Sequence, residues 1–132
     1  MRNRKRRKRP RKASRRYVLV KALDRLWSLV VRKRAGWKCE WCGATERLQG
    51  AHLFPKGAYP ALRHDPSNGA CLCWSCHLGP RGAHKDVMIW AEHFERILGK
   101  RGQTVEALRQ RALTARRPDR EAIRLALEKE LG

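Results

Sequence analysis

Two Cys-x-x-Cys motifs constrain the fold of this 132-residue chain more than any other feature. Cys39 and Cys42 form the first motif, Cys73 and Cys76 form the second, and 30 residues separate them. Two such turns can bring four thiolates around one tetrahedral Zn²⁺ ion. A disulfide framework is the poorer interpretation, because the chain has five cysteines and no evident signal peptide. We therefore predict a structural zinc site, with the fifth cysteine, Cys71, as a small buried apolar residue.

Apolar periodicity predicts helices on both sides of an irregular middle segment that is rich in glycine and proline. The expected elements are a helix over 17–35, loops and short strands in a zinc core over 36–85, and C-terminal helices over 86–132. These last comprise a helix over 86–98, one from about 104 to 115, and one from Pro118 with Ile123, Leu127 and Leu131 on its apolar face. We predict an α+β fold in a single zinc-stabilised domain over 17–132, because so small a core needs the folding free energy of a metal.

The formal net charge of +20 points to a polyanionic partner, because each neutralised phosphate releases condensed counterions. Eleven of the 32 Lys and Arg residues lie between Arg2 and Arg16. We expect residues 1–16 to be a disordered basic tail, whose alternative role is only to keep the protein soluble. The candidate nucleic-acid contacts are Arg2, Arg4, Lys5, Arg6, Arg7, Lys8, Arg9, Arg63, Arg81 and Lys85.

Membrane insertion is the competing interpretation of the apolar stretch over 17–31, which follows the basic segment as the core of a signal peptide would. Lys21, Asp24 and Arg25 interrupt this stretch, and each would cost roughly 3 kcal/mol in a membrane. We therefore expect a soluble amphipathic helix, no membrane partner, and a cytoplasmic protein that is not secreted.

Histidine, aspartate and asparagine side chains gather between and just after the two cysteine motifs, in greater number than a passive zinc site needs. They are His52, His64, Asp65, Asn68, His77 and His84. Their order, with Gly50-Ala51-His52 after the first motif, Asn68 before the second and His77 directly after it, resembles the His-Asn-His (HNH) endonucleases. The chain is also similar to the phage NinG/Rap recombination nucleases, through His52, the stretch from Gly57 to Arg63, Asp65, Asn68 and the second cysteine motif. That likeness covers roughly residues 37–110.

The resemblance implies a treble-clef or ββα-metal core and a metal-dependent DNA endonuclease that acts in a bacterial or phage-infected cell. It implies that His52 is the general base, that Asn68 holds the site through its amide, and that His77, beginning the helix after the second motif, binds catalytic Mg²⁺ or Mn²⁺. An imidazole with a pKa near 6.5 suits the role of the base at neutral pH. The family likeness favours branched, Holliday-junction-like or recombination DNA as substrate. Symmetric cutting of a junction would require a homodimer.

Ala51 departs from the HNH pattern, in which Asp or His at this position supplies a metal ligand. His84 or Asp65 supplies the missing ligand, or fewer side chains hold the ion together with phosphate and water, or the site is inactive. We prefer His84, because the short loop from Gly79 to Gly82 could fold it back beside His77.

Two other functions stay open from the sequence. One is a catalytically inactive, zinc-dependent nucleic-acid-binding module, and the other is an RNA-binding zinc ribbon. His64 could be either a ligand or a structural residue, whereas we expect His93 to be an ordinary surface residue or a core residue whose polar atoms are satisfied. We expect Trp37, Trp41 and Trp74 to pack at the cysteine motifs rather than to stack on bases.

Overall fold

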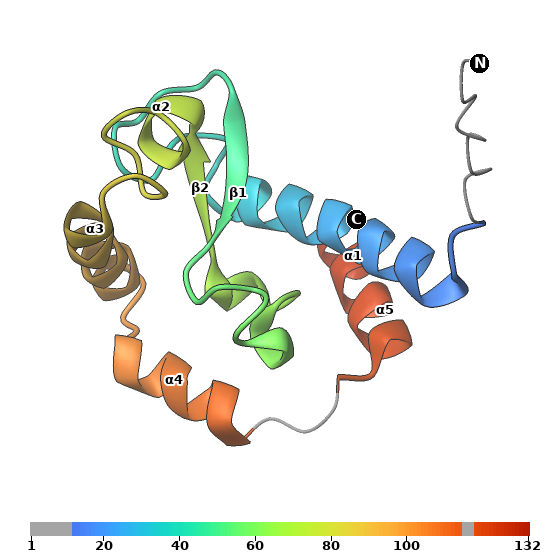
Figure 1. Ribbon diagram of the computed structural model, residues 1–132. Helices are drawn as coiled ribbons and strands as arrows, with labels where there is room; N and C mark the ends of the chain where they lie inside the picture. Colours follow the sequence, from blue (N-terminus) through green and yellow to red (C-terminus); the bar gives the residue numbers. More distant parts are fainter. Residues whose placement is uncertain (1–11, 115–117) are drawn as a thin grey trace, which may run out of the picture.

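The computed structural model describes residues 12–114 and 118–132. Within them the chain has an α+β fold of five α-helices and a two-stranded antiparallel sheet (Figure 1). The elements are α1 (Arg15–Arg34), β1 (Leu48–His52), the 3-10 turns η1 (Pro60–Leu62) and η2 (Pro66–Asn68), β2 (Gly69–Cys73), α2 (Trp74–His77), α3 (Val87–Lys100), α4 (Val105–Thr114) and α5 (Arg120–Leu131). None of the described helices is long and apolar enough to cross a membrane.

Helix α1 begins two residues earlier than predicted, because the Ser14 side chain accepts a hydrogen bond from the backbone N–H of Tyr17 and caps the helix. Arg15 and Arg16 therefore belong to the helix, and the predicted tail over 1–16 was too long at this end. The tail positions Arg2, Arg4, Lys5, Arg6, Arg7, Lys8 and Arg9 lie outside the described residues.

The two strands pair with Leu48 opposite Cys73 and His52 opposite Gly69. All five residues of β2 are buried, and successive side chains face opposite sides of the sheet. Cys71 packs with α1 and α5, whereas Ala70 and Leu72 pack with α3 and α4. Strand β2 therefore separates two apolar clusters.

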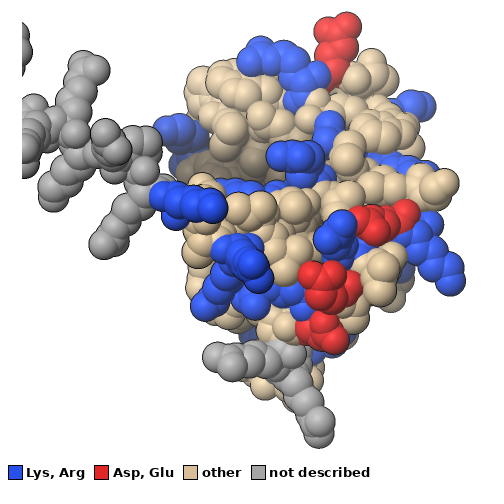
Figure 2. Space-filling model, turned by 90° about the vertical axis from the view of Figure 1, so that its right-hand side faces the viewer, with Lys and Arg blue, Asp and Glu red and all other residues tan. Residues whose placement is uncertain are grey.

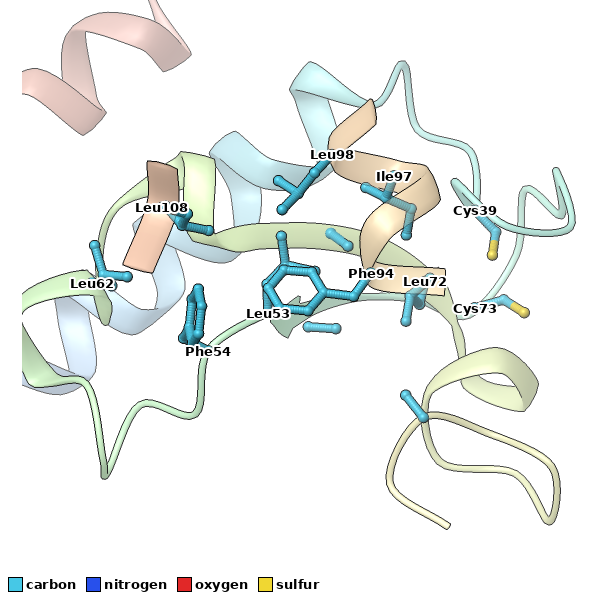
Figure 3. Packing of buried hydrophobic residues seen from close by; sticks show 13 residues of the cluster. Cys39, Leu53, Phe54, Leu62, Leu72, Cys73, Phe94, Ile97, Leu98 and Leu108 are labelled. Carbon is cyan, nitrogen blue, oxygen red and sulfur yellow. The ribbon is translucent and has the colours of Figure 1, made fainter. Parts of the chain in front are cut away.

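The larger cluster lies between the sheet, the loop after β1 and the helices α3 and α4 (Figure 3). Its largest members are Leu53, Phe54, Leu62, Leu72, Phe94, Ile97, Leu98 and Leu108. The smaller cluster joins α1 to α5 through Leu23, Trp27, Val30, Val31, Cys71 and Leu127. Ile123 and Leu131 pack against this second cluster, which confirms the apolar face predicted for the last helix.

Gly69 allows α1 to lie directly against the sheet. A Cβ atom at this position would come within 2.3 Å of Val31 Cγ2 and 2.8 Å of Trp27 Cζ2. The absence of a side chain at Gly69 thus brings Trp27 next to the end of β1, where His52 lies.

The C-terminal helices differ from prediction only at their ends. Helix α3 continues through Gly99 and stops at Lys100, and Gly102, with a φ of 67°, provides the left-handed turn that follows. Helix α5 begins at Arg120, because the side chain of Asp119 accepts a hydrogen bond from the backbone N–H of Ala122.

Candidate metal centre and candidate active site

Cys39, Cys42, Cys73 and Cys76 form a cluster whose sulfur atoms all lie within 4.8 Å of one another. The Sγ atoms of Cys42 and Cys73 are 3.6 Å apart. Four thiolates at the usual Zn–S distance lie about 3.8 Å apart around a tetrahedral ion. The four cysteines could therefore hold a metal ion, and their geometry is consistent with structural zinc.

Local backbone geometry presents the two pairs of thiols to one another. In the first motif the N–H of Cys39 bonds to the carbonyl of Ala44, and Gly43, with a φ of 78°, turns the chain. In the second motif Cys73 ends β2 and Cys76 lies on the single turn of α2. Cys71 is fully buried outside the cluster, as predicted.

A cleft of about 530 Å³ lies beside the sheet. Three of the histidines singled out in the sequence, His52, His77 and His84, line it together. Helix α1 contributes Asp24 and Trp27 to the lining of the cleft, and the loop after β1 contributes Lys56.

The His52 ring is held by two contacts. It stacks on Trp27 at a centroid distance of 3.9 Å and an interplanar angle of 6°, and its Nε2 lies 2.8 Å from the carbonyl oxygen of Arg63. A carbonyl can only accept a hydrogen bond, so Nε2 carries the proton and the lone pair of the neutral ring is on Nδ1. Burial is the main cause that lowers the pKa of His52, aided by the charge of Lys56 and opposed by the hydrogen bond to Arg63.

His77 is oriented by Gln49 of β1, whose Oε1 lies 2.8 Å from His77 Nδ1. The amide oxygen accepts, so the lone pair of the neutral ring is on Nε2, the arrangement that a metal-binding imidazole requires. Burial, followed by the neighbouring His84 and His52, lowers the pKa of His77 to about 4. The expectation that His77 begins a helix was wrong: it is the last residue of α2, because the chain turns at Gly79.

The loop after α2 brings His84 back to His77. The N–H of His84 bonds to the carbonyl of His77, and the two ring centroids are 4.6 Å apart. A Cβ atom on Gly79 would lie 2.6 Å from Ser75 O, and one on Gly82 would lie 2.9 Å from His77 O. This tight return therefore depends on both glycines.

Asn68 is fully buried and bonds to the loop that follows His52. Its Oδ1 accepts from the N–H of Phe54 at 2.7 Å, and its Nδ2 donates to the carbonyls of Phe54 at 3.0 Å and Leu62 at 3.1 Å. Asn68 does not line the cleft, so its geometry is that of a residue that holds the loop in place.

Asp65 lies outside the cleft, which overturns its place as an alternative metal ligand. Its carboxylate accepts from the N–H of Ser67 and pairs with Arg111. His64 is also outside the cleft and bonds through Nε2 to Asp24, which gives it a structural role.

Among the candidate nucleic-acid contacts, Arg63 is not free to bind substrate, because Asp24 holds its guanidinium in a half-buried ion pair. Arg81 and Lys85 are exposed.

The cleft histidines do not make a second preformed metal cluster. Over residues 12–114 and 118–132, the four cysteines are the only group of three or more His, Cys, Asp or Glu residues with all ligand atoms within 4.8 Å. A second ion in the cleft would therefore rely on His77 and His84 together with ligands from outside the described residues, such as phosphate and water. Protein-family models, curated proteins and solved structures give no match to this chain.

Asp24 is the residue of the cleft that sequence reasoning missed. Burial alone would raise the pKa of Asp24, but hydrogen bonds from Arg63 and His64 and their charges lower it to about 2. From the sequence, Asp24 was interpreted only as a charge that argues against membrane insertion of the apolar stretch over 17–31. Its spacing from Trp27 and Ser28, three and four residues on, was the available signal, because such residues share one face of a helix.

The tryptophans and His93 differ in part from expectation. Trp37 is 46% exposed with Arg32 over its ring, so it does not pack at the cysteine motif. Trp41 does pack there, with His93 stacked on it. His93 is buried, but its Nδ1 has no hydrogen-bond partner among the described residues, so the expectation of satisfied polar atoms was wrong for this nitrogen.

Proposed function

We propose that this protein is a metal-dependent DNA endonuclease of the HNH type, built on a zinc-stabilised treble-clef or ββα-metal core. The observation that carries the proposal is the anchored His52 imidazole in the same cleft as His77 and His84. Its N–H is committed to the Arg63 carbonyl, so the lone pair that a general base needs is on Nδ1.

His52 is the proposed general base. Its lowered pKa keeps the ring neutral at pH 7, and a neutral imidazole can accept the proton of an attacking water. Stacking on Trp27 and the bond to Arg63 restrict the rotation of the ring, which favours one orientation toward the water.

His77 and His84 are the proposed protein ligands of a catalytic Mg²⁺ or Mn²⁺. Such an ion would polarise the scissile phosphate and stabilise the leaving oxygen. Mg²⁺ usually retains several waters and takes few protein ligands when it binds substrate phosphates. HNH sites usually have a metal ligand at the position of Ala51. In this proposal His84, phosphate and water take the place of that ligand, and Asp65 does not.

The proposed substrate class rests on charge. The net charge is +20, and Lys and Arg cover much more of the face in Figure 2 than Asp and Glu do. Phosphate neutralisation by such a surface favours nucleic acid of any sequence. The choice of branched or recombination DNA, and of a homodimer that cuts both strands of a junction, rests on the resemblance to the NinG/Rap nucleases.

The test is cleavage of plasmid and four-way-junction DNA by the zinc-loaded full chain, with and without Mg²⁺ or Mn²⁺. We expect metal-dependent nicking that His52→Ala abolishes, because the variant lacks the proposed general base. Zinc content, thermal unfolding and DNA binding of the variant serve as controls and should match the wild type closely. Metal-dependent nicking by a folded His52→Ala protein would refute the assignment of the base.

A catalytically inactive nucleic-acid-binding module is the second candidate. It is favoured by Ala51 and by the lack of a third protein ligand beside His77 and His84 among the described residues. Salt-dependent DNA binding without nicking, on any substrate and with either metal, would support this module over the nuclease. Preference for structured RNA over DNA at matched salt would instead indicate an RNA-binding zinc ribbon.

A further inference from the structure

The Arg63 carbonyl determines which nitrogen of His52 carries the proton, so whatever holds this carbonyl also holds the proposed base. The carbonyl belongs to a loop between η1 and η2, outside any strand or long helix. Asn68 bonds to the carbonyl of Leu62 on one side of it. Further support comes from α1, which precedes this loop by about 30 residues in the sequence.

Three consecutive loop residues are bonded to one face of α1. Arg63 makes a two-pronged contact with Asp24, with Nε to Oδ1 at 2.9 Å and a terminal nitrogen to Oδ2 at 2.8 Å. His64 Nε2 lies 2.7 Å from Asp24 Oδ1. Trp27, one turn along α1, donates from Nε1 to the carbonyl of Asp65 at 2.9 Å. The loop therefore cannot move away from α1 without breaking these bonds.

The ion pair between Asp24 and Arg63 is partly buried and links the loop to α1. The Arg63 and Asp24 side chains are only 25% and 23% exposed, so water competes less with the contact than at the surface. Paired arginine and carboxylate groups with two parallel hydrogen bonds also have a defined geometry. The same pairing neutralises the carboxylate in a cleft that would receive a phosphate.

We infer that Asp24 is a positioning residue for His52, acting through Arg63. Its carboxylate holds the Arg63 side chain, the Arg63 carbonyl holds His52 Nε2–H, and Trp27 supports the face of the ring. Helix α1 is thereby part of the site, although it precedes both cysteine motifs. This inference rests on the proposed function for its catalytic consequence, whereas its effect on the His52 ring is independent of catalysis.

The experiment compares Asp24→Ala, Arg63→Ala and the double variant in the zinc-loaded full chain. The first measurement is the ¹H–¹⁵N spectrum of the histidine rings at neutral pH, without DNA. We expect the wild-type His52 to be protonated at Nε2, and both single variants to show a mixture of tautomers. The second is cleavage kinetics, in which kcat should fall by ~10- to 100-fold, as for other residues that orient a catalytic group, while KM changes by less than about threefold.

The double variant tests whether the two residues act as one unit. Residues that act through one another show non-additive effects, so the double variant should lose no more kcat than the worse single variant. Asp24→Asn, which keeps the shape of the side chain and one acceptor oxygen, is the variant to use if Asp24→Ala does not fold. It should recover part of the Nε2-protonated population.

Arg34→Ala is the control on the same helix. Arg34 pairs with Glu130 of α5, and neither residue lines the cleft. This variant should leave the His52 tautomer unchanged. An unchanged tautomer in folded Asp24→Ala would overturn the inference whether or not the protein cuts DNA. A shifted tautomer in a protein that never cuts DNA would support the positioning role and contradict only the proposed function.

Discussion

At the scale of single residues, the site depends on polar side chains that have lost contact with water and found specific partners. Asn68 is the clearest case, because its amide satisfies both the N–H and the carbonyl of Phe54 and also the carbonyl of Leu62. Phe54 and Leu62 lie near the two ends of the loop between His52 and Arg63, and this loop contains no strand. A buried backbone group without a partner costs about 1–3 kcal/mol, so one amide here has a large effect.

Asn68→Ala should therefore lower the free energy of unfolding by about 2–4 kcal/mol, because it leaves buried backbone groups unpaired. Urea denaturation of the zinc-loaded protein measures this loss. Ser67→Ala is the control at the neighbouring residue, because it leaves the hydrogen bonds of the Asn68 side chain in place. A loss for Asn68→Ala no greater than that for Ser67→Ala would contradict the structural role of the amide.

At the scale of elements, α2 is a single turn, and the return of the chain after it matters more for the site than the helix does. The segment from Leu78 to Lys85 is held by backbone bonds from Ala83 to Cys76 and from His84 to His77. His84 reaches His77 only because the chain passes close to the end of α2 at two glycines. The second cysteine motif and the part of the cleft that holds His77 and His84 are thus built by one continuous segment.

Gly82→Ala should destabilise the protein by about 1–3 kcal/mol, because the new Cβ would overlap backbone atoms of His77 and Ser75. In the proposed nuclease it should also reduce metal-dependent cleavage, since His84 would be displaced. Gly99→Ala is the matched control. Gly99 lies in α3 with no atom within 4 Å of its added Cβ, so alanine there should stabilise the helix by up to about 1 kcal/mol. Thermal unfolding distinguishes the two, and equal effects would contradict the steric argument.

At the scale of the whole molecule, two apolar clusters meet at β2, and the four cysteines lie at the end of the sheet away from His52. The backbone between the cysteine motifs contributes few helical hydrogen bonds of its own. Zinc bound to four thiolates would therefore stabilise the sheet, the cleft and the junction with α3 together.

Cys42→Ser should abolish stoichiometric zinc binding and the cooperative unfolding transition, because binding of structural zinc contributes directly to folding free energy. Metal analysis and circular dichroism measure the two effects. Cys71→Ala should retain one zinc ion per chain and cost only about 1 kcal/mol, since Cys71 is a buried residue outside the cluster. Unchanged zinc content in Cys42→Ser would exclude the four-thiolate site.

The four-cysteine cluster and the long helices could be predicted from the sequence because their signals are local. Each Cys-x-x-Cys turn places two thiols within four residues, and each helix shows its apolar face within one segment. The approach of His84 to His77 was foreseen for the same reason, since two glycines in four residues allow a tight return.

Only the tertiary structure decided which polar residues meet across the chain. Asp24 pairs with Arg63 because Gly69 lets α1 pack against the sheet, and no local pattern records a contact between residues 39 positions apart. Because of the same packing, Arg63 is paired with Asp24 and is not available as a substrate contact. Asp65 lies outside the cleft, where it forms an ion pair with Arg111. Residue spacing along the chain was thus enough to predict the cysteine cluster and the long helices. The partners of the buried charges depended on packing between distant segments, which excludes water from some surfaces and not from others.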